Sequence, residues 1–364
     1  MHSKGVITLM AVAALSVVAA AAVSFTGGTA SVDPLVGKPV LPEVKAKSDT
    51  VAKVVVKRVG GTATFVRKGD GWTVLEKGGY PADAAKVRKM LLGLAEIAYV
   101  EPKTAEPSLY KRLNVEDPAA EKSQSALVEV YDAQGAELGK VIAGRRRIDE
   151  LGGGNDGVYV RLPNEPRSWL ARGTLDLDSD IAQWLDRRIV DINEKRTKSA
   201  ALQHADGTTL AITRDKPEDK FAVQDLPAGR KLKSDTGAVE PATVLQAFDL
   251  TDVKAAGEAA FPKDGLDTAT YTTFDGLAVK VELAKVGEAD WIRLSATASG
   301  DDKIKAEADT LNQRWSPWVY GIAPYKATAL RTKMEDLLEA PPAPAPAPPA
   351  GAQSTPAAPL QKKP

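Results

Sequence analysis

The sequence contains no cysteine, only two histidines and no surplus of either charge. The absence of cysteine excludes disulfides, thiolate nucleophiles and cysteine-ligated metals. Two histidines, of which His2 lies near the N-terminus, are too few for a zinc site or for a histidine-based triad with recognisable partners. The 48 basic and 48 acidic side chains balance, whereas a nucleic-acid binder carries a positive surplus. We therefore expect no metal, no other cofactor and no nucleic-acid partner.

Charged side chains are also scarce at the N-terminus, where Lys4 is the only one before Asp33. Residues 6–23 are almost entirely apolar, and as a helix they would be about 27 Å long, close to the hydrocarbon thickness of a bilayer. Two interpretations of residues 1–30 remain open: a signal peptide that is cleaved, and an uncleaved signal anchor, which the length of the apolar stretch favours. By the positive-inside rule, both place the folded part outside the cytoplasm.

A similar order of predicted elements occurs twice, in residues 53–162 and again in residues 199–294. Each copy opens with a strand pair that turns at a Gly-Thr dipeptide. An aromatic-led strand, a proline-started helix, a second hairpin and an aromatic-x-Arg-Leu strand follow. The matched residues are Gly61 and Gly207, Trp72 and Phe221, Pro81 and Pro241, Tyr131 and Phe274, and Tyr159 and Trp291. This order predicts an α+β fold of two tandem similar units, each an antiparallel sheet of hairpins with one main helix.

Helical spacing of apolar residues marks the main helix of each repeat. These residues are Val87, Met90, Leu91, Leu94 and Ile97 in the first repeat, and Val244, Leu245, Phe248 and Leu250 in the second. The predicted domains are a signal anchor or signal peptide (1–30), a linker (31–52), a first α+β repeat (53–175), a bridging helix capped by Asp180 (176–198), a second α+β repeat (199–299), C-terminal helices (300–339) and a disordered Pro/Ala-rich tail (340–364).

No residue pattern predicts catalysis. His204 stands alone beside a turn, where a solvated surface histidine is the expected state. The acidic run 176–180 superficially resembles a calcium loop, but Ile181 and Arg187 occupy the places of the required glycine and glutamate, so helix capping is favoured. The glycine-rich run 152–157 lacks the Lys-Ser/Thr of a phosphate-binding loop, and no Gly-x-Ser-x-Gly elbow occurs. We expect no catalytic, cofactor-binding or metal-binding residues, and hence no enzyme.

Two clusters are candidates for an interaction surface. Their residues are Arg145, Arg146, Arg147, Trp315, Trp318 and Tyr320. The three arginines suit an anionic glycan or lipid headgroup, although a solvated loop that is neutralised by the acidic residues after it is favoured. The aromatic residues suit a recognition surface, although aromatic residues beside turns more often close a core, which is the favoured interpretation here.

Several short motifs occur in a fixed order along the chain. They are Gly71-Trp72-x-Val74 with Tyr80-Pro81-Ala82-Asp83, Tyr110-x-x-Leu113 with Asp117-Pro118, Tyr159-Val160-Arg161, Trp184-Leu185-Asp186-Arg187-Arg188-Ile189, and Trp318-Val319-Tyr320-x-Ile322-x-x-Tyr325. Together they resemble the DUF4340 family, a bacterial family of unknown function, over about residues 54–338. The resemblance implies an N-terminally anchored envelope protein and an accessory role beside gliding-type ABC transporter components. It supplies no catalytic residues.

We therefore expect a non-catalytic envelope protein. It would be a single-pass protein of the bacterial inner membrane, held by residues 6–23, whose periplasmic part binds or scaffolds partners such as ABC transporter subunits. A soluble periplasmic ligand-binding protein, released by cleavage of the leader, is the first alternative. An envelope hydrolase that uses unrecognised carboxylates is the second.

Overall fold

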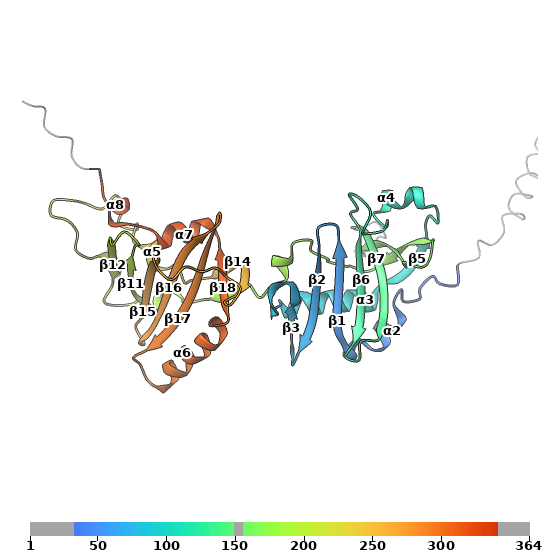
Figure 1. The fold of residues 1–364 in the computed structure, drawn as a ribbon, viewed down its shortest axis with the longest axis horizontal. Coiled ribbons are helices and arrows are strands. Elements are labelled where there is room, and N and C mark those ends of the chain that lie inside the picture. The colour runs from blue at the N-terminus through green and yellow to red at the C-terminus, as the bar shows by residue number, and fades with distance from the viewer. Residues whose placement is uncertain (1–32, 149–155, 341–364) are drawn as a thin grey trace, which may run out of the picture. The chain divides into compact units, whose positions relative to one another are not determined.

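The computed structural model describes residues 33–148 and 156–340 (Figure 1). The predicted N-terminal apolar helix, most of the glycine-rich run 152–157 and the tail from residue 341 lie outside the described residues. Within them, no helix is both long and apolar enough to cross a bilayer. The chain divides into two compact units: unit 1 contains the residues up to Arg187 together with Thr251–Ala255, and unit 2 contains Arg188–Leu250 and the residues from Ala256 onward.

Unit 1 is built on an antiparallel sheet. Among the described residues it has nine strands in the order β4-β3-β2-β1-β6-β7-β8-β9-β5. The strands are β1 (Val51–Arg58), β2 (Gly61–Lys68), β3 (Gly71–Val74), β4 (Tyr80–Pro81), β5 (Ala98–Pro102), β6 (Ala126–Asp132), β7 (Glu137–Arg147), β8 (Gly157–Arg161) and β9 (Ser168–Arg172). The helices are α2 (Pro42–Ala46), α3 (Ala84–Glu96) and α4 (Tyr110–Leu113), with 3-10 turns η1 (Ser48–Thr50), η2 (Leu75–Lys77), η3 (Pro107–Leu109) and η4 (Ile181–Trp184).

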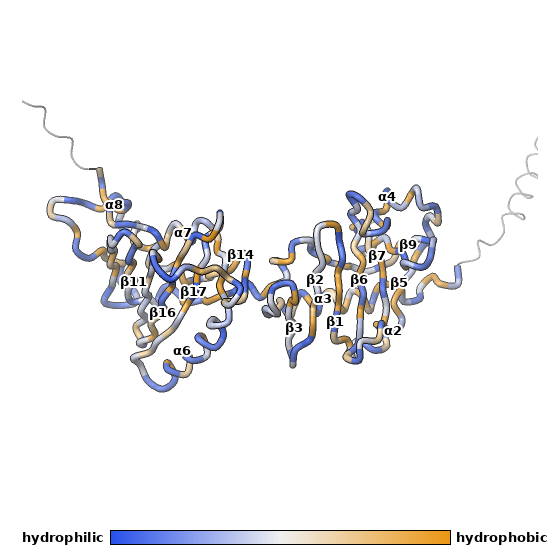
Figure 2. The backbone as a smooth tube through the Cα atoms, in the orientation of Figure 1, coloured by the Kyte–Doolittle hydropathy of each residue, from blue (hydrophilic) through white to orange (hydrophobic). Residues whose placement is uncertain are grey.

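The main helix of unit 1 is α3, as predicted. Asp83 caps it, because its carboxylate accepts hydrogen bonds from two backbone N–H groups of the first turn at 2.9 and 3.1 Å. Val87, Met90 and Leu94 of the predicted stripe are buried. Buried residues alternate with half-buried ones along β6, and Figure 2 shows the apolar colour gathered on the strands of each unit.

Unit 2 is built on a second antiparallel sheet. Among the described residues its nine strands have the order β10-β14-β18-β17-β16-β15-β11-β12-β13. The strands are β10 (Arg188–Val190), β11 (Thr197–Gln203), β12 (Thr209–Thr213), β13 (Ala222–Val223), β14 (Phe248–Ala255), β15 (Asp267–Thr273), β16 (Leu277–Val286), β17 (Ala289–Ala298) and β18 (Trp318–Ile322). The helices are α5 (Val239–Ala242), α6 (Asp302–Trp315), α7 (Pro324–Leu330) and α8 (Met334–Leu337), with one 3-10 turn η5 (Glu194–Arg196).

The two sheets share one topology. The order β13-β12-β11-β15-β16-β17-β18-β14 in unit 2 corresponds strand by strand to β3-β2-β1-β6-β7-β8-β9-β5 in unit 1. An irregularity is shared too, because the register shifts between Val51 and Lys53 where β1 pairs with β6, and between Thr197 and Ser199 where β11 pairs with β15. The mixed α and β class with two antiparallel sheets is confirmed, and α6 is an insertion between β17 and β18.

Both repeats also end on the same closing segment, which returns to the region after the third strand. Leu185 forms an isolated antiparallel bridge with Ala82 in unit 1, and Leu338 forms one with Leu232 in unit 2. The backbone hydrogen bonds beside these bridges match as well: Asp83 N to Trp184 O, Lys233 N to Leu337 O, Asp186 N to Pro81 O, and Glu339 N to Lys231 O. Each repeat therefore extends beyond the copies that the sequence pattern indicated, residues 53–162 and 199–294.

The segment predicted as a bridging helix, residues 176–198, has only one short 3-10 turn in its first half, η4. Asp180 caps this turn as predicted, because its carboxylate accepts a hydrogen bond from Ala182 N at 3.0 Å. Strand β10 and turn η5 follow. The prediction of a helix is wrong for the residues after η4, because the backbone there is extended and pairs with the backbone around Ala82.

The predicted main helix of the second repeat is also wrong. Only the single turn α5 forms there, and Phe248 and Leu250 lie in strand β14. Pro241 falls inside the turn rather than at its start, and the helix ends directly after it, at the C-cap Thr243. The largest described helix of unit 2 is α6, in the polar segment that was predicted to be helical; Asp301 caps it by accepting a hydrogen bond from Ile304 N at 3.1 Å.

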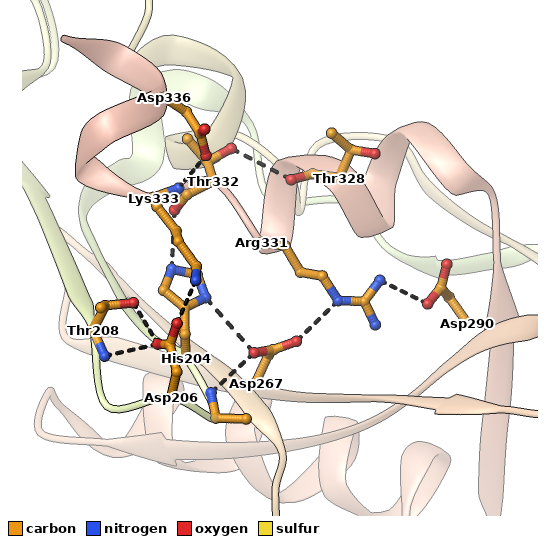
Figure 3. Close-up of polar contacts among 11 residues, drawn as sticks. His204, Asp206, Thr208, Asp267, Asp290, Thr328, Arg331, Thr332, Lys333 and Asp336 are labelled. Atoms are coloured by element: carbon orange, nitrogen blue, oxygen red, sulfur yellow. Dashed lines mark hydrogen bonds and ion pairs between the residues drawn. The ribbon is translucent and has the colours of Figure 1, made fainter.

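The C-terminal helices predicted for residues 300–339 also include α7 and α8, which a break separates. Between them, the Thr332 carbonyl accepts a hydrogen bond from His204 at 3.1 Å, and Lys333 pairs with Asp206 (Figure 3). In a continuous helix this carbonyl would be bonded inside the helix instead. The contacts to the β11–β12 turn therefore account for the break.

Candidate functional site

Unit 1 contains a cavity of about 410 Å³ beside the ends of β1 and β7, which we call the Arg58 cavity. The residues that line it are Arg58, Lys86, Lys89, Gln124, Ala143, Gly144, Arg146, Leu175, Asp176, Leu177, Asp178 and Trp184. Four of these side chains are basic and two are acidic, so the lining has a surplus of two positive charges. The leucines and the tryptophan supply an apolar part of the wall.

Arg58 is the last residue of β1, and its guanidinium contributes to the wall of the cavity. Its Nη2 donates a hydrogen bond to Leu177 O at 2.7 Å. Its Nε is buried and has no hydrogen-bond partner within the part of the chain that the structure describes. Burial lowers the pKa of Arg58, and the charge of Asp178 opposes this effect. Because arginine keeps its charge under such conditions, the wall of the cavity contains a partly desolvated cation, one of whose buried donors has no acceptor among the described residues.

Lys86 and Lys89 come from neighbouring turns of α3 and therefore lie on one side of the helix. Lys86 Nζ donates to Gln183 O at 2.6 Å. Lys89 Nζ lies 2.5 Å from Asp176 Oδ2. This hydrogen bond from Lys89 is the main cause that lowers the pKa of Asp176, and Arg146 adds to it. Asp176 thus stays ionised and holds two of the cations at the edge of the cavity.

The arginine run 145–147 lies in strand β7 and not in a loop as predicted. Successive side chains of a strand point to opposite faces, and this separates Arg146 from its neighbours. Arg146 pairs with Asp176 and lies 3.1 Å from Asp156 Oδ2. Arg145 and Arg147 instead both lie near the ring of Tyr159, at 5.8 Å from its centroid. The run therefore contributes one residue to the cavity, and that residue, Arg146, pairs with Asp156 and Asp176.

The aromatic cluster predicted as an alternative interaction surface belongs largely to the core of unit 2. Trp315 is 1% exposed and Tyr320 is fully buried, while Trp318 is half-buried. Trp315 Nε1 donates to Ile189 O at 3.1 Å. The favoured interpretation, that these residues close a core, is therefore correct for Trp315 and Tyr320. They are in a different unit from the arginines.

His204 is buried, at 4% exposure, and not solvated as predicted. Figure 3 shows its ring between the chain at Thr332 and the carboxylate of Asp267. Because the Thr332 carbonyl can only accept, the 3.1 Å contact places a proton on Nε2 of the ring. Asp267 in turn pairs with Arg331, which also contacts Asp290 at 2.7 Å. This network attaches the segment between α7 and α8 to the β11–β12 hairpin.

No cluster of three metal-ligating side chains occurs among residues 33–148 and 156–340. The three aspartates of the superficial calcium loop have separate roles. Asp176 pairs with Lys89 and Arg146, and Asp180 caps η4. Asp178 accepts a hydrogen bond from the backbone N–H of Asp180 at 3.0 Å. The arrangement suits turn formation and charge pairing.

No sequence pattern indicated a site role for three of the cavity's four cations. Arg58, Lys86 and Lys89 were part of a predicted strand and a predicted helix, where charged residues usually mark a solvated face. Arg146 was identified, but as part of a loop. These residues meet because β1, α3 and β7 converge at one end of the sheet, and no local spacing encodes that convergence.

Comparison with known proteins places the chain in a family. A family profile described as "Domain of unknown function (DUF4340)" matches residues 72–273. This span is more than half of the 364 residues, and it runs from β3 of unit 1 to the end of β15 in unit 2. A search of curated proteins finds no match to the chain. The protein belongs to the DUF4340 family.

Proposed function

We propose that the protein is a non-catalytic binding component of the bacterial envelope, whose unit 1 recognises an anionic group in the Arg58 cavity. The observation that carries this proposal is the buried Nε of Arg58, which has a positive charge and no partner among the described residues. Leaving such a donor unpaired costs about 1–3 kcal/mol. A carboxylate or phosphate oxygen at this position would remove that cost.

The charge of the wall supports the same conclusion. Lys86, Lys89 and Arg146 surround Arg58 in the lining, and Asp176 and Asp178 compensate only part of their charge. Hydrogen bonds between ionised groups are about twice as strong as neutral ones. An anionic group would thus gain from both the unused donor and the positive surplus.

Citrate and inorganic phosphate provide a direct test. At matched ionic strength, millimolar citrate or phosphate is expected to raise the melting temperature of the full chain, because a ligand that binds only the folded state stabilises it. Arg58→Met is expected to remove this rise. Arg88→Met, an exposed residue of α3 outside the cavity lining, is the charge-matched control and should respond like the wild type. An equal response of both variants would contradict an anion site at Arg58.

The envelope location is part of the proposal and is supported by the apolar residues 6–23 and by the family. In this proposal residues 6–23 hold the chain in the inner membrane, both units lie in the periplasm, and ABC transporter subunits are the partners. Crosslinking in intact cells followed by mass spectrometry should recover such subunits. Repeated recovery of no membrane complex would count against the partner. A mature N-terminus near residue 22 or 31 would replace the anchor by a cleaved, soluble periplasmic protein.

A further inference from the structure

We infer that the Arg58 cavity receives a short acidic helix of a partner protein, in the place that α7 occupies in unit 2. This inference rests on the proposed function and names the kind of partner that the cavity fits. It depends on the internal repeat, because unit 2 shows what fills the same position in a related fold. The inference follows from three comparisons between the repeats: the end of the first strand, the walls around it and the closing segment.

The end of the first strand is equivalent in the two units. The register shift at Val51 in β1 corresponds to the one at Thr197 in β11. Counting the same number of residues from each leads to Arg58 and His204. Both side chains bind a backbone carbonyl of the closing segment of their own unit: Arg58 donates to Leu177 O, and His204 donates to Thr332 O. Arg58 and His204 therefore hold equivalent segments.

In unit 2 this region is filled by the chain itself. Helix α7 contacts both α5 and β15, which are the equivalents of α3 and β6. Its Ala327 and Leu330 are 1% and 2% exposed. Lys326 Nζ donates to Val244 O at 2.7 Å and to Gln246 O at 3.0 Å. As Figure 3 shows, Arg331 follows the helix and reaches Asp267 and Asp290.

Unit 1 has no described helix at this position. The chain between β9 and η4 is shorter than the chain between β18 and α8, and residues 173–180 form neither helix nor strand. The walls that would face such a helix, namely α3 and the chain beside β6 and β7, line the Arg58 cavity instead. The cavity is thus the part of the repeat that unit 2 completes with its own helix.

The charges of the two positions are opposite. In unit 2 the filling segment brings the cations Lys326 and Arg331 to carbonyls and carboxylates of the fold. In unit 1 the fold itself supplies the cations. Asp176 of the closing segment already pairs with Lys89 and Arg146, whereas the buried Nε of Arg58 lacks an acceptor within the described residues. A helix that fits unit 1 would therefore bring a carboxylate to Arg58. Its small or apolar side chains would contact the Leu175 and Leu177 part of the wall.

The test uses α7 as the template for two synthetic peptides. One has the sequence of residues 323–332, and the other carries Lys326→Glu and Arg331→Glu in the same sequence. Both are stapled, because isolated helices shorter than about 12–15 residues are marginal in water. Binding to the full chain is measured by fluorescence anisotropy of the labelled peptide. The acidic peptide is expected to bind at least about tenfold more tightly than the unchanged one, and Arg58→Met should weaken it about tenfold.

Two variants keep the result interpretable. Lys86→Met removes a second cation of the cavity and should also weaken the acidic peptide, whereas Arg88→Met should not. If citrate stabilises the chain through Arg58 but both peptides bind equally or not at all, the helical occupant is overturned and the anion site stands. If neither the stabilisation by citrate nor the binding of the acidic peptide depends on Arg58, both the occupant and the proposed function are overturned.

Discussion

Alanine in place of Trp315 is expected to lower the free energy of unfolding by about 3–5 kcal/mol. The indole is 1% exposed, so its removal leaves a cavity that the surrounding sheet cannot fill completely. The Ile189 carbonyl also loses the hydrogen bond from the indole N–H. Guanidinium denaturation of the full chain, followed by circular dichroism, measures the change in the transition of unit 2.

The control for this prediction is Tyr325→Ala. Tyr325 is 63% exposed, and loss of such a side chain changes stability by only about 0.5 kcal/mol or less. If Trp315→Ala were as mild as the control while weakening capture of a partner, Trp315 would belong to a recognition surface after all. The variant therefore separates the two interpretations that the sequence left open for this aromatic cluster.

Methionine in place of Arg214 is expected to lower the free energy of unfolding by about 2–4 kcal/mol. The carbonyl of the buried Thr197 loses both of its donors, which costs about 1–3 kcal/mol, and the contacts with Pro217 and Phe221 are lost as well. Arg214 is 4% exposed. Its Nε and Nη2 donate to Thr197 O at 3.0 and 2.8 Å, and Nη1 donates to Pro217 O at 2.9 Å. The guanidinium also lies 4.2 Å from the centroid of the Phe221 ring.

The repeat provides a matched control for this second prediction. Arg67 has the same place in unit 1: Nη1 donates toward Val51 O, and the guanidinium lies over the Trp72 ring at 5.9 Å. Arg67 is exposed, so water can replace its contacts, and Arg67→Met should cost less than about 1 kcal/mol. Equal costs in the two variants would show that burial does not distinguish these equivalent arginines. Thermal and chemical denaturation of both variants measures the difference.

The sequence predicted burial better than it predicted the type of element. Val244, Leu245, Phe248 and Leu250 are all buried, at 2% exposure or less, as their apolar pattern indicated. The pattern was assigned to one helix, but 244, 245 and 248 fit a helical period while 248 and 250 fit a strand, and short apolar runs do not distinguish the two. Tertiary pairing decides the assignment, because Phe248 and its neighbours pair with β10 as strand β14.

The prediction that Pro241 starts a main helix was wrong for a similar reason. Pro81 and Pro241 were matched because a proline suits the first turn of a helix. In the structure, the residue that corresponds to Pro81 is Lys231, as the matching bridges of Ala82 and Leu232 show. Asp83 explains why α3 forms, since it caps the helix. No side-chain cap precedes α5, and the equivalent stretch makes only one turn.

Local sequence patterns could not predict the Arg58 cavity. Arg58, Lys86, Arg146 and Asp176 come from a strand, a helix, a second strand and a closing segment. Each is an ordinary charged residue in its own segment. The sheet order that joins β1 to β6 and β6 to β7 brings them to one edge, and that order is a property of long-range pairing.

The closing segments affect how the chain is completed during synthesis. Asp186 pairs with Pro81, so the strand pairing within the first repeat can finish once residue 186 has left the ribosome. The second repeat instead depends on Glu339, which pairs with Lys231. Premature termination shortly before residue 339 would thus leave one finished lobe joined to one that lacks its final backbone bridge, and proteases would act on the second lobe first.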